Sequence, residues 1–477
     1  MSRVITEFSE DDSTPYQRAI RTLVQRINYE RVGHPDYCDA NYRLDRMRKL
    51  LFHLRDPHLA APVIHIAGTK GKGSTATLLA QMLTASGYRT GLYTSPHLVR
   101  LEERFRIDNR PCDEANFVHL VTETQLAADR VEAEGNGPAT YFEMTTAIAM
   151  LHFAQQNVQA VVLEVGLGGR LDSTNVCQPI VSLITSIGLD HQAQLGSTIA
   201  AIAGEKAGII KRSVPVVTSS RHPEARRVIE ATARALSAPL RSLTRDFDCT
   251  WRPLLGLPAV NGDTQQEQAT SQCEFIPRYD NSHLGHSTWS LALLGAHQGD
   301  NLAAALAAID ILAESGWKLS LPVLAAAVAR TTVPARLQTV GQRPYRLIDT
   351  AHNPDSIAAT LNALDEHFPN RPVTIVLATS RDKDIEGMLR LICGRCQRLI
   401  VTQYHNNPRG LPVDELLCLA NRIVAAPGSP DAALPTLISG EKTTSDAWQR
   451  AMQLASADDV ICATGSFFQA AELLGLQ

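Results

Sequence analysis

The sequence predicts an α/β fold in which two domains each carry a mainly parallel sheet. At 477 residues the chain is too long for one ordinary hydrophobic core. Short apolar runs alternate with segments of helical period in both halves, which is typical of parallel strands joined by crossover helices. The alternation is interrupted near residue 334 and then restarts. We therefore expect an N-terminal domain over residues 1–333 and a smaller C-terminal domain over residues 334–477.

The first domain shows five strand-like runs separated by helical segments. The runs cover residues 62–68, 88–95, 158–166, 179–188 and 214–219. Apolar residues at helical spacing follow or intervene over residues 74–87, 146–156 and 198–210. This order predicts a parallel sheet covered by helices on both faces.

A different texture separates this region from the second domain. Residues 245–292 are polar and rich in glutamine and serine, which favours a small antiparallel excursion with a long turn. A segment with helical periodicity covers residues 301–316. The stretch "TTVPARLQTVGQRP" (331–344) then supplies prolines and a glycine at the expected boundary. In the second domain the expected strands cover residues 345–351, 373–380, 398–404 and 459–466, and a last helix covers residues 467–475.

Composition excludes several classes of protein. The net charge is −4, and no dense basic stripe with interleaved aromatic residues suggests nucleic-acid binding. The N-terminus lacks the order of a signal peptide, and no apolar run is long enough to span a bilayer. Nine scattered cysteines fit reduced thiols, and Cys393 and Cys396 read as two thiols one turn apart on a helix. We expect a soluble, cytoplasmic protein with no nucleic-acid or membrane partner.

The stretch "HIAGTKGKGST" (65–75) lies between the first strand and the first helix, where a phosphate loop belongs. It departs from the common pattern twice. Gly68 stands only three positions before Gly71, and Lys72 is followed by Gly73 instead of a hydroxyl residue. The hydroxyl groups come next, at Ser74 and Thr75. The loop by itself is modest evidence for phosphate binding.

Polar residues follow the ends of three more predicted strands, where ligands bind in an open parallel sheet. They are Ser95, Glu164 and the pair Asp190 and His191. A hydroxyl, a carboxylate and an imidazole gathered there can hold a cation beside a phosphate, and magnesium suits such a set. Each also has a structural interpretation: a turn before a proline for Ser95, an ion pair with Arg170 for Glu164, and a strand end for His191.

Further candidates lie in a helix, at the boundary and in the second domain. Lys206 in "GEKAGIIK" could equally be a solvated residue beside Glu205. "DTAHNP" places Asp349, His352 and Asn353 at a strand end, where they could bind an amine and a carboxylate, and Arg336 stands at the joint between the domains. "GLGGR" (166–170) opens no clean helix and is weak evidence for a dinucleotide.

Together these stretches resemble the Mur-ligase superfamily, and within it folylpolyglutamate synthase and dihydrofolate synthase. The collinear motifs, from about residue 15 to the C-terminus, are "HIAGTKGKGST", "YTSPHLVRLEER", "YFEMTTAIA", "VVLEVGLGGRLDSTN", "ITSIGLDH", "GEKAGII", "GAHQGDN", "PARLQ", "DTAHNP", "DKD", "TQYHNNPRG" and "ICATGS". The resemblance implies an N-terminal P-loop ATPase domain joined to a Rossmann-like C-terminal domain, with catalysis in the cleft between them. The protein is expected to act as a monomer.

The resemblance also implies roles for individual residues. Ser95, Glu164 and His191 would ligate magnesium, and Lys206 matches a lysine that is carbamylated in the family and helps to bind a second magnesium ion. Lys72, His191, Lys206, Asp349 and His352 would act in catalysis, the last two around the nucleotide and the incoming glutamate. The implied ATP-binding positions are Gly68, Thr69, Gly71, Lys72, Gly73, Ser74, Thr75, Asn301, Arg336 and Asp349. The sequence departs from the family at Lys70, often Asn, and at Ala335 and Thr350, usually Gly.

The expected activity is ATP-dependent addition of L-glutamate to a folate-type carboxylate through an acyl phosphate. The acceptor would be dihydropteroate, a reduced folate or both, and residues 28–47 and the "YFEMTT" region would contribute to the pterin surface. Two alternatives stay open: another Mur-type amino-acid ligase, and a P-loop ATPase switch without ligase activity. A dinucleotide oxidoreductase is disfavoured because no G-x-G-x-x-G follows the first strand.

Overall fold

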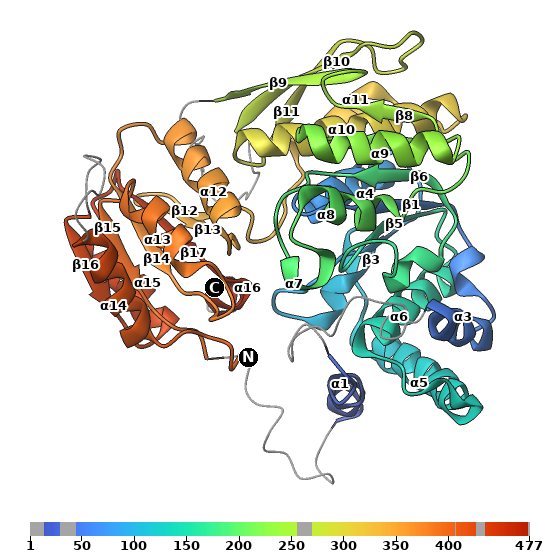
Figure 1. Ribbon diagram of the computed structural model, residues 1–477, viewed down its shortest axis with the longest axis horizontal. Coiled ribbons are helices and arrows are strands. Elements are labelled where there is room, and N and C mark those ends of the chain that lie inside the picture. The colour runs from blue at the N-terminus through green and yellow to red at the C-terminus, as the bar shows by residue number, and fades with distance from the viewer. Residues whose placement is uncertain (1–13, 29–43, 255–269, 406, 426–434, 476–477) are drawn as a thin grey trace.

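The computed structural model describes residues 14–28, 44–254, 270–405, 407–425 and 435–475. Figure 1 shows a larger unit, coloured blue to yellow, beside a smaller unit coloured orange to red. The described residues form an eight-stranded and a three-stranded sheet in the larger unit and a six-stranded sheet in the smaller one. The predicted α/β class is confirmed in both units.

The eight-stranded sheet has the strand order β4-β3-β2-β5-β1-β6-β7-β8 among the described residues. Strands β2, β5, β1, β6, β7 and β8 pair in parallel. At one edge, β3 pairs antiparallel with β2 and β4 pairs antiparallel with β3. The strands are β1 (Val63–Ala67), β2 (Thr90–Tyr93), β3 (Phe105–Ile107), β4 (Arg110–Pro111), β5 (Ala160–Glu164), β6 (Pro179–Ile184), β7 (Val216–Thr218) and β8 (Leu240–Ser242). The five strand-like runs all became strands, while β3, β4 and β8 were not predicted.

Alternation along the strands buries both faces of this sheet. Ile64 and Ile66 of β1 belong to one hydrophobic cluster, and Val63, the first residue of the same strand, belongs to another. The first cluster includes side chains of α4 (Lys72–Ala85), α10 (Ala296–Glu314) and α11 (Leu321–Ala329). The second includes side chains of α1 (Pro15–Val24), α3 (Leu44–His53), α5 (Glu114–Val131) and α6 (Tyr141–Gln155). A further cluster is formed with α8 (Ile199–Ala207) and α9 (Pro223–Ala235), and the short helix α7 (Gln192–Leu195) precedes α8.

The three-stranded sheet is antiparallel, as the polar texture of residues 245–292 predicted. Its strands are β9 (Phe247–Pro253), β10 (Ser271–Pro277) and β11 (Ser287–Leu291), in the order β11-β10-β9. The long turn expected within residues 255–269 lies outside the described residues. Phe247, Phe275 and Trp289 bury one face of this sheet in the same cluster as α10. The excursion is therefore packed against the larger unit as part of its core.

The smaller unit has the strand order β12-β13-β17-β14-β15-β16 among its described residues. All pairings are parallel except that of β12 with β13. The strands are β12 (Gln338–Gly341), β13 (Tyr345–Ile348), β14 (Val373–Leu377), β15 (Arg398–Val401), β16 (Leu437–Gly440) and β17 (Val460–Thr464). The four predicted strands are confirmed, and β12 and β16 were missed.

Helices cover both faces of this second sheet. One hydrophobic cluster joins it to α12 (Pro354–His367), α13 (Ile385–Cys393) and α14 (Val413–Val424), and another joins it to α15 (Thr444–Leu454) and α16 (Phe467–Leu474). Helix α13 ends at Cys393, so Cys396 lies beyond it, and both thiols are buried. Burial raises the pKa of the Cys393 thiol to about 11. Buried, protonated thiols are structural residues of the core.

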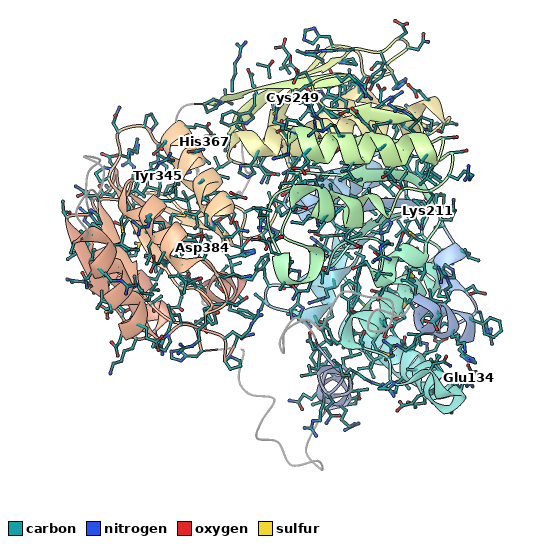
Figure 2. All side chains as sticks on the ribbon, in the orientation of Figure 1. Glu134, Lys211, Cys249, Tyr345, His367 and Asp384 are labelled. Atoms are coloured by element: carbon teal, nitrogen blue, oxygen red, sulfur yellow. The ribbon has the colours of Figure 1, made fainter. Side chains whose placement is uncertain are left out.

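Contacts join the two units along their facing edges. Figure 2 labels His367 on the side of α12 that faces the larger unit. Its Nε2 accepts a hydrogen bond from the backbone N–H of Gly295 (3.3 Å), and its ring meets Trp251 edge-on with centroids 5.5 Å apart. In the part of the chain that the structure describes, no helix has both the length and the apolar character needed to cross a membrane.

Candidate active site

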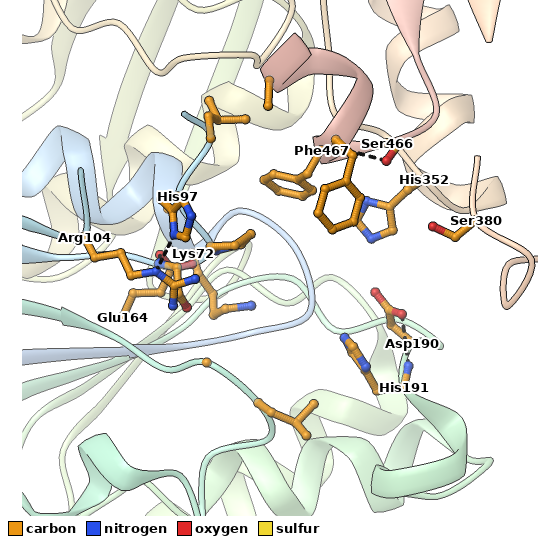
Figure 3. Close-up of a pocket in the computed structure, with 18 of the residues that line it drawn as sticks. Lys72, His97, Arg104, Glu164, Asp190, His191, His352, Ser380, Ser466 and Phe467 are labelled. Carbon is orange, nitrogen blue, oxygen red and sulfur yellow. Dashed lines mark hydrogen bonds between the residues drawn. The ribbon is translucent and has the colours of Figure 1, made fainter. Parts of the chain in front are cut away.

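A cleft of about 2420 Å³ lies between the two units and contains the phosphate loop. Residues from the loops after β1, β2, β5 and β6 line it on one side, and residues from the loops after β13, β14 and β17 line it on the other. These are the carboxyl ends of parallel strands, where ligands bind in such sheets. Figure 3 shows Lys72 and Glu164 on one wall, and His352 and Phe467 on the opposite wall. Most of the sequence-predicted residues thus line one cavity, whereas Gly68, Thr75 and Lys206 do not line it.

The phosphate loop joins β1 to α4, as the strand, glycine loop and helix pattern predicted. Gly71 precedes the first residue of α4 and has φ +86°, a left-handed conformation that favours glycine. A β carbon at Gly71 would overlap the Asn301 amide, whose Cγ would lie 3.0 Å away. Asn301, on the buried helix α10, is therefore held against the loop. The Lys72 ammonium donates to the carbonyl of Gly68 (2.9 Å).

The other loop positions predicted for ATP lie in the same segment. Gly68, Thr69 and Gly73 precede or begin α4, and Ser74 and Thr75 are buried in its first turn. The Thr69 N–H donates to the carbonyl of Ser186 (2.7 Å), which ties the loop to the strand end after β6. The backbone N–H groups at the start of α4 form an N-terminus suited to phosphate.

Glu164 ends β5 as a buried carboxylate in the cleft. Its Oε2 accepts a hydrogen bond from the backbone N–H of Ser95 (3.1 Å), and both carboxylate oxygens lie 3.6–3.7 Å from where a β carbon on Gly73 would stand. Burial raises the pKa of Glu164, against the opposing effect of Lys72. The ion pair with Arg170 is ruled out, because Arg170 bonds Glu205 instead (3.1 Å). A buried carboxylate beside a phosphate loop suits a hard divalent cation.

The third predicted magnesium ligand lies on the loop after β6. His191 has φ +50° and is exposed, and its backbone N–H donates to Asp190 Oδ1 (3.0 Å). Figure 3 shows Asp190 and His191 on a separate loop from Glu164. Among the described residues, no group of three or more His, Cys, Asp or Glu side chains is close enough to hold a metal ion. The carboxylate of Glu164 and the nearby hydroxyl residue Ser95 still fit magnesium, because this ion takes few protein ligands and completes its shell with phosphate and water.

Lys206 is buried, so its interpretation as a solvated helix residue is wrong. It is 5 % exposed, near the end of α8, and its Nζ donates to the carbonyl of Gly68 (3.0 Å). Burial, and to a lesser extent the nearby Lys72, together lower the pKa of Lys206 to about 7. The amine is thus partly neutral near pH 7 and lies against the phosphate loop.

The second unit contributes a buried carboxylate, Asp349, and a guanidinium group, Arg336, to the cleft. Asp349 is buried and accepts hydrogen bonds from the backbone N–H groups of Leu337 (3.0 Å) and Ala351 (2.8 Å) and from the Thr360 hydroxyl (2.9 Å). Its carboxylate therefore holds the loops after β13 and before β12 in place. Arg336 donates to the hydroxyl of Thr350 (2.6 Å).

His352 presents an imidazole to the cleft. Its Nδ1 lies 2.8 Å from the carbonyl of Thr350, so Nδ1 carries the proton and Nε2 keeps a lone pair. Burial lowers the pKa of His352 well below its ordinary value, and Lys70 contributes to this effect. The ring also packs near Phe467, with centroids 5.8 Å apart.

Three cleft residues escaped the sequence reasoning as functional candidates. The Lys70 ammonium contacts Asp190 on its own side of the cleft and His352 across it, contacts between distant segments that no local pattern signals. Asp172 lines the cleft as a buried carboxylate that accepts from the backbone N–H groups of Gly166 and Leu167. Its position after "GLGGR" was the available signal. Phe467 opens α16 and faces His352.

Comparisons with known proteins agree with this arrangement. Residues 66–309 match the Mur ligase middle domain, and residues 335–467 match the Mur ligase glutamate ligase domain. The folylpolyglutamate synthase of Lacticaseibacillus casei is 34 % identical over 431 residues, which cover 89 % of this chain and 92 % of the relative. The structure of Mycobacterium tuberculosis folylpolyglutamate synthase complexed with ADP superposes with a TM-score of 0.81 at 30 % identity and covers 97 % of this chain and 98 % of the other.

A second solved structure extends the likeness to a complex with two ligands. Escherichia coli FolC in complex with DHPP and ADP has a TM-score of 0.78 and 28 % identity, and the match covers 97 % of this chain and 98 % of that one. The similarity therefore spans both domains and the cleft between them. The chain belongs to the folylpolyglutamate synthase/dihydrofolate synthase family of Mur ligases.

Proposed function

We propose that this protein uses ATP to join L-glutamate to a folate-type carboxylate, with ADP and phosphate as the other products. The observation that carries the proposal is the single cleft, which has a phosphate loop on one wall and the His352 loop of the glutamate ligase domain on the other. The names of the relatives and the ADP in their structures support it. We further propose that the protein acts as a monomer and that its two domains divide at residues 333 and 334, between α11 and β12.

The chemistry requires activation of the acceptor carboxylate, because an amine cannot displace oxide from it. Transfer of the γ-phosphoryl group of ATP converts the carboxylate to an acyl phosphate, whose leaving group is phosphate. Lys72 and the backbone N–H groups at the start of α4 are placed to hold the transferred phosphoryl group. The amine of glutamate then attacks the acyl carbon, and phosphate leaves.

Magnesium would be held on the phosphate-loop side of the cleft. Glu164, Ser95 and His191 are the residues proposed to hold it, with Glu164 the best supported by its burial and position. When bound, magnesium neutralises charge on the phosphate oxygens. Asn301, packed against Gly71, and Arg336 are proposed to contact the nucleotide from the two sides of the cleft.

The glutamate side of the reaction is assigned to the second domain. The imidazole of His352 lies at the wall of the cleft, where we propose that it lies against the incoming glutamate. Asp349 holds this loop in place through its buried hydrogen bonds, and this support of the loop is its proposed role in catalysis. Closure of the two domains around the substrates would exclude water and protect the acyl phosphate from hydrolysis.

Phosphate release by the purified protein tests the proposal. ATP, magnesium and glutamate are supplied with dihydropteroate, with tetrahydrofolate or with no acceptor, and the products are identified by mass spectrometry. We expect one or both pteridines to stimulate turnover and to gain one glutamyl residue. Turnover without a pteridine, or none with either, overturns the assignment. Stimulation instead by a cell-wall nucleotide precursor would identify another Mur-type ligase.

We propose separately that Lys206 carries a carbamate that helps to bind a second magnesium ion. The neutral amine attacks carbon dioxide, forms an N–C bond and loses one proton. The buried position of Lys206 and its lowered pKa support this step. Isotope-labelled bicarbonate should give a carbamate carbon resonance in the wild-type protein and none in Lys206→Met. Equal signals in the two proteins would remove the modification from this site.

A further inference from the structure

Lys70 lies in the phosphate loop, and its side chain reaches across the cleft to the glutamate ligase domain. Its Nζ donates to Asp190 Oδ2 at 2.8 Å and lies 3.4 Å from His352 Nε2. Figure 3 shows Asp190 and His352 on loops that belong to opposite walls. Asp190 follows β6 in the first domain, and His352 follows β13 in the second. One ammonium group thus joins three loops of the active site.

Asp190 is the shared acceptor of this contact. Besides Lys70, its Oδ2 accepts a hydrogen bond from Asn353 Nδ2 of the second domain (3.3 Å), and its Oδ1 accepts from the backbone N–H of His191. Because a carboxylate can accept several hydrogen bonds at once, Asp190 bonds residues of both domains. The side chain of Asp190 is 13 % exposed, which limits the screening of its contacts by solvent.

The geometry of His352 depends on two partners. The Thr350 carbonyl accepts from Nδ1 and fixes the proton there, while the ammonium of Lys70 donates to the lone pair of Nε2. Lys70 therefore links His352 Nε2, on the cleft side of the ring, to the phosphate loop. A side chain without a donor at position 70 would remove this hydrogen bond, and the imidazole of His352 would then be held by the Thr350 carbonyl alone among these two partners.

We propose that Lys70 is a positioning residue of the ligase: it sets His352 and Asp190 against the phosphate loop and so prepares the glutamate side of the cleft. The inference rests on the proposed function. It assigns Lys70 a task different from that of Lys72, which bonds Gly68 within its own loop. Loss of the Lys70 donor should weaken binding of glutamate, whereas binding of ATP should be little changed.

The test compares three variants in the phosphate-release assay with ATP, magnesium, glutamate and the pteridine that stimulates the wild-type protein. Lys70→Met keeps most of the length of the side chain and removes the donor, and Lys70→Arg keeps a charged donor. Lys318→Met removes an exposed lysine between α10 and α11 and serves as the control for lost charge. Thermal unfolding of each variant shows whether the fold is retained.

We expect Lys70→Met to raise the KM for glutamate by about tenfold, the effect of losing one hydrogen bond to a charged group. Its KM for ATP should stay within about twofold of the wild-type value. A change of that size is smaller than the roughly tenfold effect expected from losing the hydrogen bond. Lys70→Arg should restore most of the glutamate KM, and Lys318→Met should match the wild type in both.

Three results would overturn the inference while leaving the proposed function intact. They are an unchanged KM for glutamate in Lys70→Met, an equal rise in both KM values, and no restoration by Lys70→Arg. A wild-type protein that no pteridine stimulates would instead overturn the proposed function, and the inference with it. The two failures are therefore separated by the wild-type control.

Discussion

Replacing Gly71 by alanine tests whether the phosphate loop and helix α10 are fitted to one another. Gly71 has φ +86° at the start of α4, and a β carbon there would overlap the side-chain oxygen of Asn301. Asn301 also donates to Gln298 (2.9 Å) within the buried part of α10, so it cannot retreat without breaking that bond. The substitution should therefore disturb both the loop and the residue proposed to contact the nucleotide.

The magnitude follows from two separate costs. A non-glycine residue in the left-handed region costs about 1–2 kcal/mol. Displacing Asn301 leaves a buried polar group without its partner, which costs about 1–3 kcal/mol more. Gly71→Ala should thus lower the free energy of unfolding by about 2–5 kcal/mol. It should also raise the KM for ATP, because Asn301 and the loop both move.

Gly87 supplies a matched control at the other end of α4. It has φ +89°, and a β carbon there would meet no atom within 4 Å. Gly87→Ala should therefore show only the backbone cost, about 1–2 kcal/mol, with an unchanged KM for ATP. Urea unfolding and initial-rate kinetics measure both variants. Equal losses of stability together with equal KM values would refute the fit between Gly71 and Asn301.

Three further predictions concern single side chains of the cleft. Glu164→Gln keeps the acceptor for the Ser95 N–H but removes the charge, so ADP formation should fall by about 100-fold or more with the circular dichroism unchanged; a smaller loss argues against a cation at Glu164. Asp349→Asn replaces a carboxylate that accepts several buried hydrogen bonds and should lower stability by about 1–3 kcal/mol in thermal unfolding; an inactive variant of wild-type stability would instead show a direct catalytic role. In bicarbonate-free buffer, the folded-state pKa of Lys206 is about 7 against an ordinary value of 10.5, because burial, Lys72 and Lys70 outweigh Asp190 and Asp172. The unfolded chain then binds the additional proton between these two values, so stability should rise with pH across this range, and Lys206→Met should lose that part of the rise.

Local pattern was sufficient for the elements that are buried in sheets. The run at residues 62–68 became β1, and the glycine loop after it led into α4, because a buried strand and a glycine-rich turn are local features. The missed strands are short and lie at or next to a sheet edge: β4, its neighbour β3 and β8 in the first sheet, and β12 and β16 in the second. Except for β3, which pairs with both β2 and β4, these strands are paired on one side only, so little apolar pattern marks them.

The candidate site divides in the same way. The positions of Ser95, Glu164 and Asp190 at strand ends could be predicted, because parallel strands bring their carboxyl ends to one edge. The burial of Lys206 could not, since its neighbours come from the phosphate loop more than a hundred residues away. The roles assigned to these residues remain predictions that the variants test.

The sequence by itself determined the fold class, the order of the central strands and the family, because periodicity and collinear motifs are properties of the chain. Only the tertiary structure decided which polar side chains face each other across the cleft. It turned Lys206 inward, gave Asp349 buried partners and brought Lys70 to Asp190 and His352. The physical reason is that burial and long-range hydrogen bonds depend on how the two domains pack, and sequence spacing carries no record of that packing.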